Sequence, residues 1–174
     1  GGFYSRAVAP PDERYASKLD ILVPDGLAHL WAPEGYSTRD SRAVHSQPGL
    51  ELCLLDHSPM RLRPVEEDDD SEPMMVEVAS ILALIVAKGW KIGERFAQGS
   101  DAFQEVRKDI ADVYRLLRAG TAAEMEAVLR ELPRDGGARD IARTGARYIR
   151  EVCGSGGPGL VLLGEVLGRN DEAR

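Results

Sequence analysis

Short apolar runs separated by turn residues occupy the first third of the chain. Residues 19–23 (Leu-Asp-Ile-Leu-Val) are mostly apolar and end at Pro24-Asp25-Gly26, which predicts a strand followed by a turn, and residues 27–31 would complete a hairpin. Residues 50–55 have the apolar content of a third strand. Residues 60–65 alternate like an edge strand that ends at Pro64. A small antiparallel sheet is therefore expected.

Residues 74–87 are apolar nearly all round, which predicts a buried central helix. The segment is shorter than the ~18–20 residues that a helix needs to cross a bilayer, so no membrane span is expected. Ala79, Ala83 and Ala87 recur every fourth residue and would form a smooth stripe. The stripe indicates either close helix packing inside the molecule or a small-residue interface for self-association or membrane insertion.

The rest of the chain follows a helical period. A helix is expected to begin at Ser100 and end before Gly120, with apolar residues three and four positions apart. Thr121-Ala-Ala-Glu124 is a capping box that should start the next helix. A further helix is expected over 138–152, followed by a glycine-rich break at 154–159 and a last short helix or strand over 160–167.

An acidic run, residues 66–72, interrupts the two patterns, because close-spaced carboxylates repel one another and cannot be buried. The sequence therefore predicts an α+β fold with a small N-terminal antiparallel β-sheet and a C-terminal bundle of about four α-helices. The expected units are a β-rich unit over 1–65, an acidic linker over 66–72 and a helical bundle over 73–174, which could also form one integrated domain.

The formal net charge of −7 arises entirely in the first part of the chain. Residues 1–72 hold 7 basic and 14 acidic side chains, whereas residues 73–174 hold 15 of each. An acidic surface opposes non-specific nucleic-acid binding by that part and suits a basic partner. The N-terminus shows no charged region followed by an apolar one, so a cytoplasmic location is expected. Cys53 and Cys153 lack ligand-like spacing and are expected to be buried, reduced thiols.

Four arginines lie within about 80° of arc on the helix expected over 138–152; they are Arg139, Arg143, Arg147 and Arg150. This arginine stripe has three interpretations. It is a solvated face paired with Asp135, Asp140 and Glu151, or it contacts anions or nucleic acid, or it docks the acidic run of the same molecule. The acidic residues concerned are Glu66, Glu67, Asp68, Asp69 and Asp70.

The three histidines, His29, His45 and His57, offer a weaker alternative. A metal site would need them to converge, or two of them to meet Asp56 or Cys53, and their spacing matches no ligand signature. Ser58 lacks the surrounding pattern of a catalytic serine. The glycine-rich stretch lacks the Lys of a phosphate-binding loop. No catalytic residue and no cofactor is predicted.

Residues 76–117 combine an alanine-spaced apolar helix, Gly-Trp-Lys and an amphipathic helix. This pattern is similar to N-terminal helical modules of fungal signalling ATPases. The similarity spans about a quarter of the chain and leaves the N-terminal part unmatched, so no fold, activity or residue role is carried over from it.

The sequence thus offers surfaces more than chemistry. It favours a non-enzymatic intracellular interaction or regulatory protein, such as an adaptor or inhibitor, with a protein partner or self-association. The alternative is an enzyme or metal-binding protein that uses the N-terminal histidines. Contact with anions or nucleic acid through the arginine stripe is the third reading.

Overall fold

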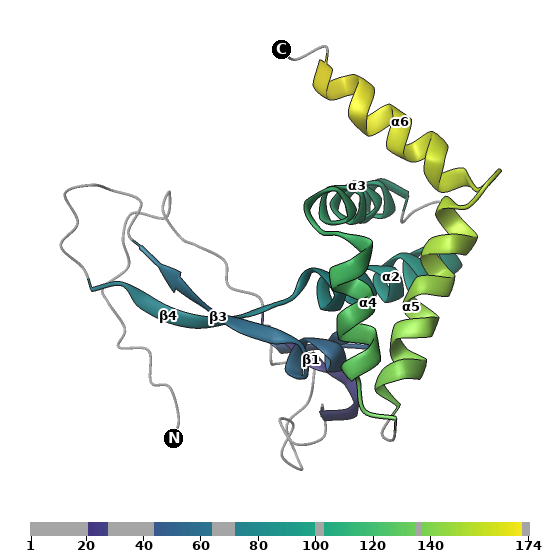
Figure 1. Ribbon diagram of the computed structural model, residues 1–174. Helices are drawn as coiled ribbons and strands as arrows, with labels where there is room; N and C mark the ends of the chain where they lie inside the picture. Colours follow the sequence, from purple (N-terminus) through teal and green to yellow (C-terminus); the bar gives the residue numbers. More distant parts are fainter. Residues whose placement is uncertain (1–20, 28–43, 64–71, 100–102, 135–136, 172–174) are drawn as a thin grey trace.

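The computed structural model describes residues 21–27, 44–63, 72–99, 103–134 and 137–171 (Figure 1). It confirms an α+β protein with a small N-terminal sheet region followed by a helical bundle. The described residues form five α-helices where about four were expected. The strands are β1 (Ile21–Pro24), β2 (Val44–Gln47), β3 (His57–Leu62) and β4 (Met74–Ala79). The helices are α2 (Ile81–Ala97), α3 (Phe103–Ala119), α4 (Ala122–Glu131), α5 (Ala138–Cys153) and α6 (Pro158–Asp171).

Helix α2 is the central element of the bundle, because both buried apolar clusters include its side chains. Near its start, Leu82, Ala83 and Val86 pack with residues of α5 and with Leu52. Near its end, Ile92 packs with residues of α3, α5 and α6. The expectation of a buried central helix is confirmed for residues 81–87, since burial of these side chains removes apolar surface from water.

Helices α2 and α5 cross closely because glycines meet at the contact. A Cβ atom on Gly145 would lie 2.8 Å from the backbone oxygen of Val86, and a Cβ on Gly89 would collide with the Gly145 carbonyl. Beside this crossing, Trp90 Nε1 donates a hydrogen bond to the Ile141 oxygen at 3.0 Å. The Trp90 ring also packs edge-on against Tyr148. Small residues therefore bring the two backbones together and one tryptophan fixes their register.

The strands pair differently from the expected single antiparallel sheet. β1 pairs with β2 in parallel, and β3 pairs with β4 antiparallel, giving two separate two-stranded sheets. Of the expected hairpin partner at 27–31, residues 28–31 lie outside the described residues, while Asp25–Leu27 is a short 3-10 turn. The β1 partner is instead a strand more than twenty residues further along the chain.

The strand expected over 50–55 is wrong, because Leu50–Leu54 forms a 3-10 turn, here called η3. Gly49 precedes it with φ of 89°, a left-handed conformation that redirects the chain. Leu52 then points into the core and is fully buried, while Leu54 and Leu55 stay exposed. The run thus forms a helical turn that buries one leucine, Leu52, and its apolar composition alone did not distinguish this turn from a strand.

The helix expected over 74–87 is wrong in its first six residues. Met74–Ala79 forms β4, and Ser80 then caps α2 by accepting a hydrogen bond from the Ala83 amide at 3.2 Å. The alanine stripe therefore does not exist as one helix face, since Ala79 lies on a strand and only Ala83 and Ala87 lie on α2. Ala83 is nevertheless fully buried in the cluster against which Ala79 packs.

The remaining helices follow the predicted pattern. The described part of the helix expected from Ser100 is α3, since residues 100–102 lie outside the described residues. The capping box of Thr121 and Glu124 is present at the start of α4. The segment at 160–167 is part of α6.

Of the acidic run, only Glu72 is described. The strands on either side of that run, β3 and β4, form one ribbon. The division into units over 1–65 and 73–174 stays a prediction.

Candidate protein-interaction surface

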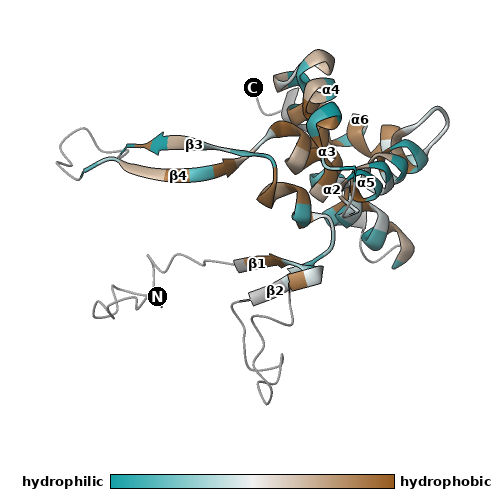
Figure 2. Ribbon diagram, turned by 60° about the horizontal axis from the view of Figure 1, so that its bottom comes forward, coloured by the Kyte–Doolittle hydropathy of each residue, from teal (hydrophilic) through white to brown (hydrophobic). Residues whose placement is uncertain are grey.

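The β3–β4 ribbon extends away from the helices, as Figure 1 and Figure 2 both show. Every residue of β3 is exposed, and so are Met74, Met75 and Glu77 of β4. Only the inner end of β4 packs against the core, through Ala79. The ribbon is thus attached to the bundle at one end and surrounded by solvent over most of its length.

The register of the ribbon separates its side chains into two unlike faces. Leu62 lies opposite Met74, Met60 opposite Val76 and Ser58 opposite Val78. Side chains of directly opposed residues share a face, and alternate residues along a strand share a face. One face, the apolar face, therefore consists of Ser58, Met60, Leu62, Met74, Val76 and Val78. The other, the polar face, consists of His57, Pro59, Arg61, Met75, Glu77 and Ala79.

The apolar face carries no charged side chain and is open to solvent. Met74 is 60% exposed, Met60 is 49% exposed and Leu62 is 42% exposed. Exposed single apolar residues are ordinary on a protein surface, but a contiguous group of them marks an interaction site. Leu54 and Leu55, next to the root of β3, are also more than half exposed.

One hydrogen bond establishes the alternation of the ladder. The Ser80 amide donates to the Asp56 oxygen at 2.9 Å, and these residues continue the β3–β4 register by one position. Hydrogen-bonded and non-hydrogen-bonded pairs alternate in an antiparallel ribbon. The pairs 58/78, 60/76 and 62/74 are therefore hydrogen-bonded. The residues at 57, 59, 61, 75, 77 and 79 direct their backbone groups toward the free edges of the ribbon.

A polar joint connects the ribbon to the bundle. Besides its backbone hydrogen bond to Asp56, Ser80 donates its hydroxyl proton to the Asp56 carboxylate. The same hydroxyl oxygen accepts the Ala83 amide, which begins α2. A single residue thus ends the strand, starts the helix and holds the other strand, so the direction of the ribbon is set by three hydrogen bonds.

The histidines do not form a site in the part of the chain that the structure describes. His57 Nδ1 lies 2.9 Å from Glu77 Oε2 on the polar face, where both side chains are exposed. His29 and the side chain of His45 lie outside the described residues. Within the described ranges, no group of three His, Cys, Asp or Glu side chains is arranged to hold a metal ion. Asp56 faces Ser80 instead.

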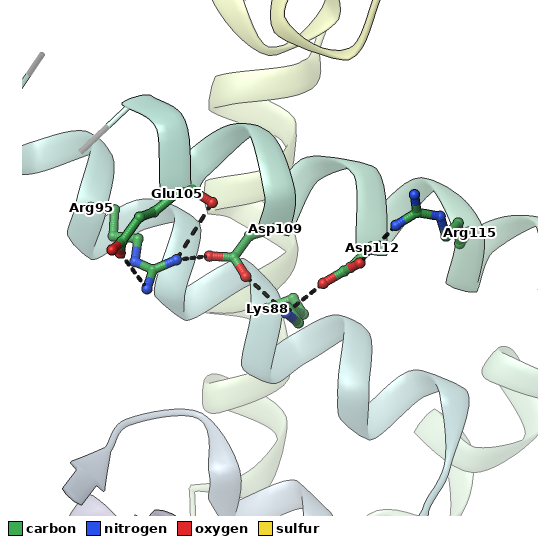
Figure 3. A network of polar contacts seen from close by, with 6 residues as sticks. All are labelled: Lys88, Arg95, Glu105, Asp109, Asp112 and Arg115. Atoms are coloured by element: carbon green, nitrogen blue, oxygen red, sulfur yellow. Dashed lines mark hydrogen bonds and ion pairs between the residues drawn. The ribbon is translucent and has the colours of Figure 1, made fainter. Parts of the chain in front are cut away.

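An ion-pair network around one buried carboxylate, that of Asp109, joins α2 to α3 (Figure 3). Asp109 is only 2% exposed, and its carboxylate accepts from Lys88 Nζ at 2.8 Å and from the Arg95 guanidinium. Lys88 also reaches Asp112 at 2.8 Å, and Arg95 reaches Glu105 at 2.6 Å. None of these residues was predicted from the sequence. Asp109 was detectable, because it lies three residues after Val106 and four before Val113 on the apolar face of α3.

The network shifts the pKa values of two of its members, Asp112 and Lys88. Burial alone would raise the pKa of Asp112, but its hydrogen bond to Lys88 and the charges of Lys88 and Arg115 lower the pKa below the usual 3.8. Burial alone would lower the pKa of Lys88, but its hydrogen bonds to Asp109 and Asp112 raise the pKa above 10.5. Both residues are therefore fully charged at neutral pH, and the network acts as a structural link between helices.

The arginine stripe of α5 finds several partners within the molecule. Arg139 donates to the Leu132 and Arg130 oxygens at the end of α4. Two of the other members of the stripe have local contacts. Arg143 pairs with Asp140 at 2.9 Å, Arg147 lies over the Tyr148 ring and 4.0 Å from Glu151, and Arg150 is exposed. Of the predicted partner carboxylates, the stripe contacts Asp140 and Glu151, and Asp135 lies outside the described residues.

An open hollow of about 430 Å³ lies at the start of α5. Its lining includes Arg134, Arg139 and Arg143 together with Asp140. Two of these guanidinium groups are already engaged, Arg139 by the α4 carbonyls and Arg143 by Asp140. The hollow is thus a weaker candidate for recognition than the ribbon, whose apolar face has no such internal partners.

The two thiols are half-buried, not fully buried as expected, and neither is in a disulfide. Burial raises the pKa of both Cys53 and Cys153, and the Asp56 charge adds to the effect at Cys53. Raised pKa values keep these thiols protonated and slow to react at neutral pH.

Comparisons with protein-family models, with characterised proteins and with solved structures found no match. Within the described residues, no helix is both long and apolar enough to span a membrane.

Proposed function

We propose that this chain is a non-enzymatic protein-interaction protein, of adaptor or inhibitor type, and that the apolar face of the β3–β4 ribbon is its contact surface. The carrying observation is that apolar face, on a ribbon that extends from the bundle and exposes Met60, Leu62 and Met74. Interfaces have uncharged, apolar centres rich in Met, with charged residues at the rim. The arrangement of the two ribbon faces fits that anatomy.

The energetics support an occupant for this face. A two-stranded ribbon on its own is marginally stable in water. Complete burial of one Met or Leu side chain stabilises by about 1.5–3 kcal/mol. Three such side chains, each about half exposed, would together gain on the order of 3 kcal/mol when covered. That gain favours binding, and further contacts must supply the rest of the free energy that association costs.

The side-chain types also suit recognition of a protein surface. Methionine is unbranched and polarizable, so it adapts to different partner shapes. The charged residues of the ribbon, Arg61 and Glu77, lie on the polar face, where binding on the apolar face leaves them in water. An occupant therefore buries no unpaired charge of this chain.

Face-specific photocrosslinking tests the proposal. A photoreactive amino acid replaces Met60 in one variant and Arg61 in the other, so that neighbouring positions report on opposite faces. We expect the Met60 variant to form a covalent adduct with a protein in the producing cell, several-fold more than the Arg61 variant. Equal adduct formation from both positions, or none from Met60, would contradict the proposal.

A folding control accompanies this experiment. Both variants must show the far-ultraviolet circular dichroism of the unmodified chain, since a disrupted ribbon would no longer keep positions 60 and 61 on opposite faces. The adduct is then identified by mass, which distinguishes a second copy of this chain from a different protein.

A further inference from the structure

The two free edges of the ribbon differ in how they are protected. Edge strands in natural proteins are blocked by proline and by Lys or Arg. β3 carries Pro59 at its centre and Arg61 beside it, and Pro59 is one of the residues directed toward the free edge. The missing N–H of Pro59 therefore interrupts the row of donors on that edge. β3 is a protected edge.

β4 has none of these protections. It reads Met-Met-Val-Glu-Val-Ala, with no proline inside it and one charge, that of Glu77. In the described structure its sheet contains only β3 and β4, so the outer edge of β4 faces no strand. Met75, Glu77 and Ala79 direct their backbone N–H and C=O groups along this edge. Unpaired backbone groups in such a row are a template for another strand.

We propose that β4 pairs antiparallel with β4 of a second copy, forming a four-stranded sheet in the order β3-β4-β4-β3 across a two-fold axis. This inference goes beyond the proposed function, because it concerns the β4 edge and not the apolar face, and it names a second copy as the occupant of that edge. The apolar faces of both ribbons then lie on the same side of the sheet and join into one larger surface.

The register of this pairing follows from the hydrogen-bond alternation and from charge. Outward-directed residues must oppose outward-directed residues, which excludes full end-to-end overlap of residues 74–79. Two registers then align five residues of each strand. One of them places Glu77 opposite Glu77 of the second copy, and like charges directly opposed destabilise a sheet. The other centres on Val76 and places Glu77 opposite Met75, so it is the register we assign.

The assigned register makes well-matched contacts. Met75 and Glu77 of each copy exchange backbone hydrogen bonds with Glu77 and Met75 of the other. On the apolar face, Val76 meets Val76 and Val78 meets Met74, which are favourable cross-strand pairs. The interface is much smaller than the ~800 Å² per partner of a standard complex, so the dimer should be weak and concentration-dependent.

Position-specific disulfide trapping tests the register. Val76 forms a non-hydrogen-bonded pair with its own copy, for which the Cα atoms lie about 4.5 Å apart, within disulfide range. Val78 lies four residues, roughly 14 Å, from its own copy, which is beyond disulfide range. Under mild oxidation we expect Val76→Cys to give a disulfide-linked dimer at least ten-fold faster than Val78→Cys. Both variants keep Cys53 and Cys153, and peptide mapping identifies the linked residues.

Proline substitution at the two edges gives an independent test. Met75→Pro removes an outward N–H from the β4 edge, and Arg61→Pro removes one from the β3 edge directly opposite, while both leave the β3–β4 ladder intact. Sedimentation equilibrium at up to about 1 mM protein, the weak end of specific association, should show a dimer for the unmodified chain and for Arg61→Pro. Met75→Pro should weaken association at least ten-fold.

The outcomes separate this inference from the proposed function. A monomer at all concentrations, equal trapping at positions 76 and 78, or equal effects of the two prolines would overturn β4 pairing. If the Met60 photoadduct then contains a different protein, the proposed function stands without the dimer. If no Met60 adduct forms while Val76→Cys is trapped, the dimer stands and the wider interaction proposal fails.

Discussion

Asp109 shows how one buried charge organises two helices. Its carboxylate is almost completely removed from water and is held by Lys88 and Arg95, both on α2. A buried charge is tolerated only when it is paired and hydrogen-bonded, so the partners of Asp109 also set the position of α3 along α2. Apolar contacts alone would allow more freedom in that alignment.

Removal of the Asp109 carboxylate should destabilise the fold strongly. Asp109→Ala leaves Lys88 and Arg95 partly buried without their shared partner, which costs about 3 kcal/mol. Asp112→Ala is the matched control, because Asp112 is more exposed and its loss should cost below about 1 kcal/mol. Urea unfolding followed by circular dichroism measures both changes. Equal losses of unfolding free energy in the two variants would show that the buried Asp109 stabilises the fold no more than the more exposed Asp112.

The raised pKa of Lys88 gives the network a pH dependence. A cation whose folded pKa lies above its unfolded value contributes stability that is complete below the unfolded pKa of about 10.5 and is lost as pH rises through the folded pKa. Lys88→Arg keeps its charge throughout this range. We expect the unmodified chain to lose more unfolding free energy than Lys88→Arg above pH 10.5, while their difference stays constant between about pH 6 and 9. Parallel curves throughout would contradict the assignment.

At the scale of elements, α2 and α5 can cross closely only because glycine at the contact leaves no Cβ atom between the two backbones. A Cβ at Gly89 would meet the backbone of α5, which cannot move aside as a flexible side chain can. Gly164 on α6 has nothing within 4 Å of the same added atom. Substitution by alanine therefore creates a backbone clash at Gly89 and meets open space at Gly164.

Alanine at these positions should change stability in opposite directions. Gly89→Ala forces α2 and α5 apart and should cost about 1–3 kcal/mol. Gly164→Ala adds helix propensity without a clash and should stabilise by about 0.5–1 kcal/mol. Thermal unfolding of both variants is the measurement. A neutral Gly89→Ala would mean that the helices do not cross as closely as described.

The elements also show which signals the sequence carries locally. The helical spacing of α3 and the capping box of α4 depend on residues within one or two turns, and both were predicted. β4 was taken for helix because its polar face also holds apolar Met75 and Ala79, which hides the period of two. Its partner β3 lies beyond the acidic run, so only long-range pairing could resolve the ambiguity.

At the scale of the whole molecule, the fold class was predictable and the candidate surface was not. Composition and periodicity are sufficient for an α+β chain with a helical bundle. The apolar face of the ribbon arises only when the register places Met60 beside Val76 and Leu62 beside Met74. Likewise, the Lys88–Asp109 contact joins residues on different helices, which no local spacing encodes.

The joint at Ser80 has a mechanical consequence. β4 passes into α2 with one intervening residue, and hydrogen bonds to Asp56 and Ala83 hold that residue in place. The ribbon, about 20 Å long at ~3.4 Å per residue, is therefore held at one end by a joint that continues directly into α2. A partner that binds the outer end of the ribbon is thereby connected, through Ser80, to the one helix whose side chains belong to both core clusters.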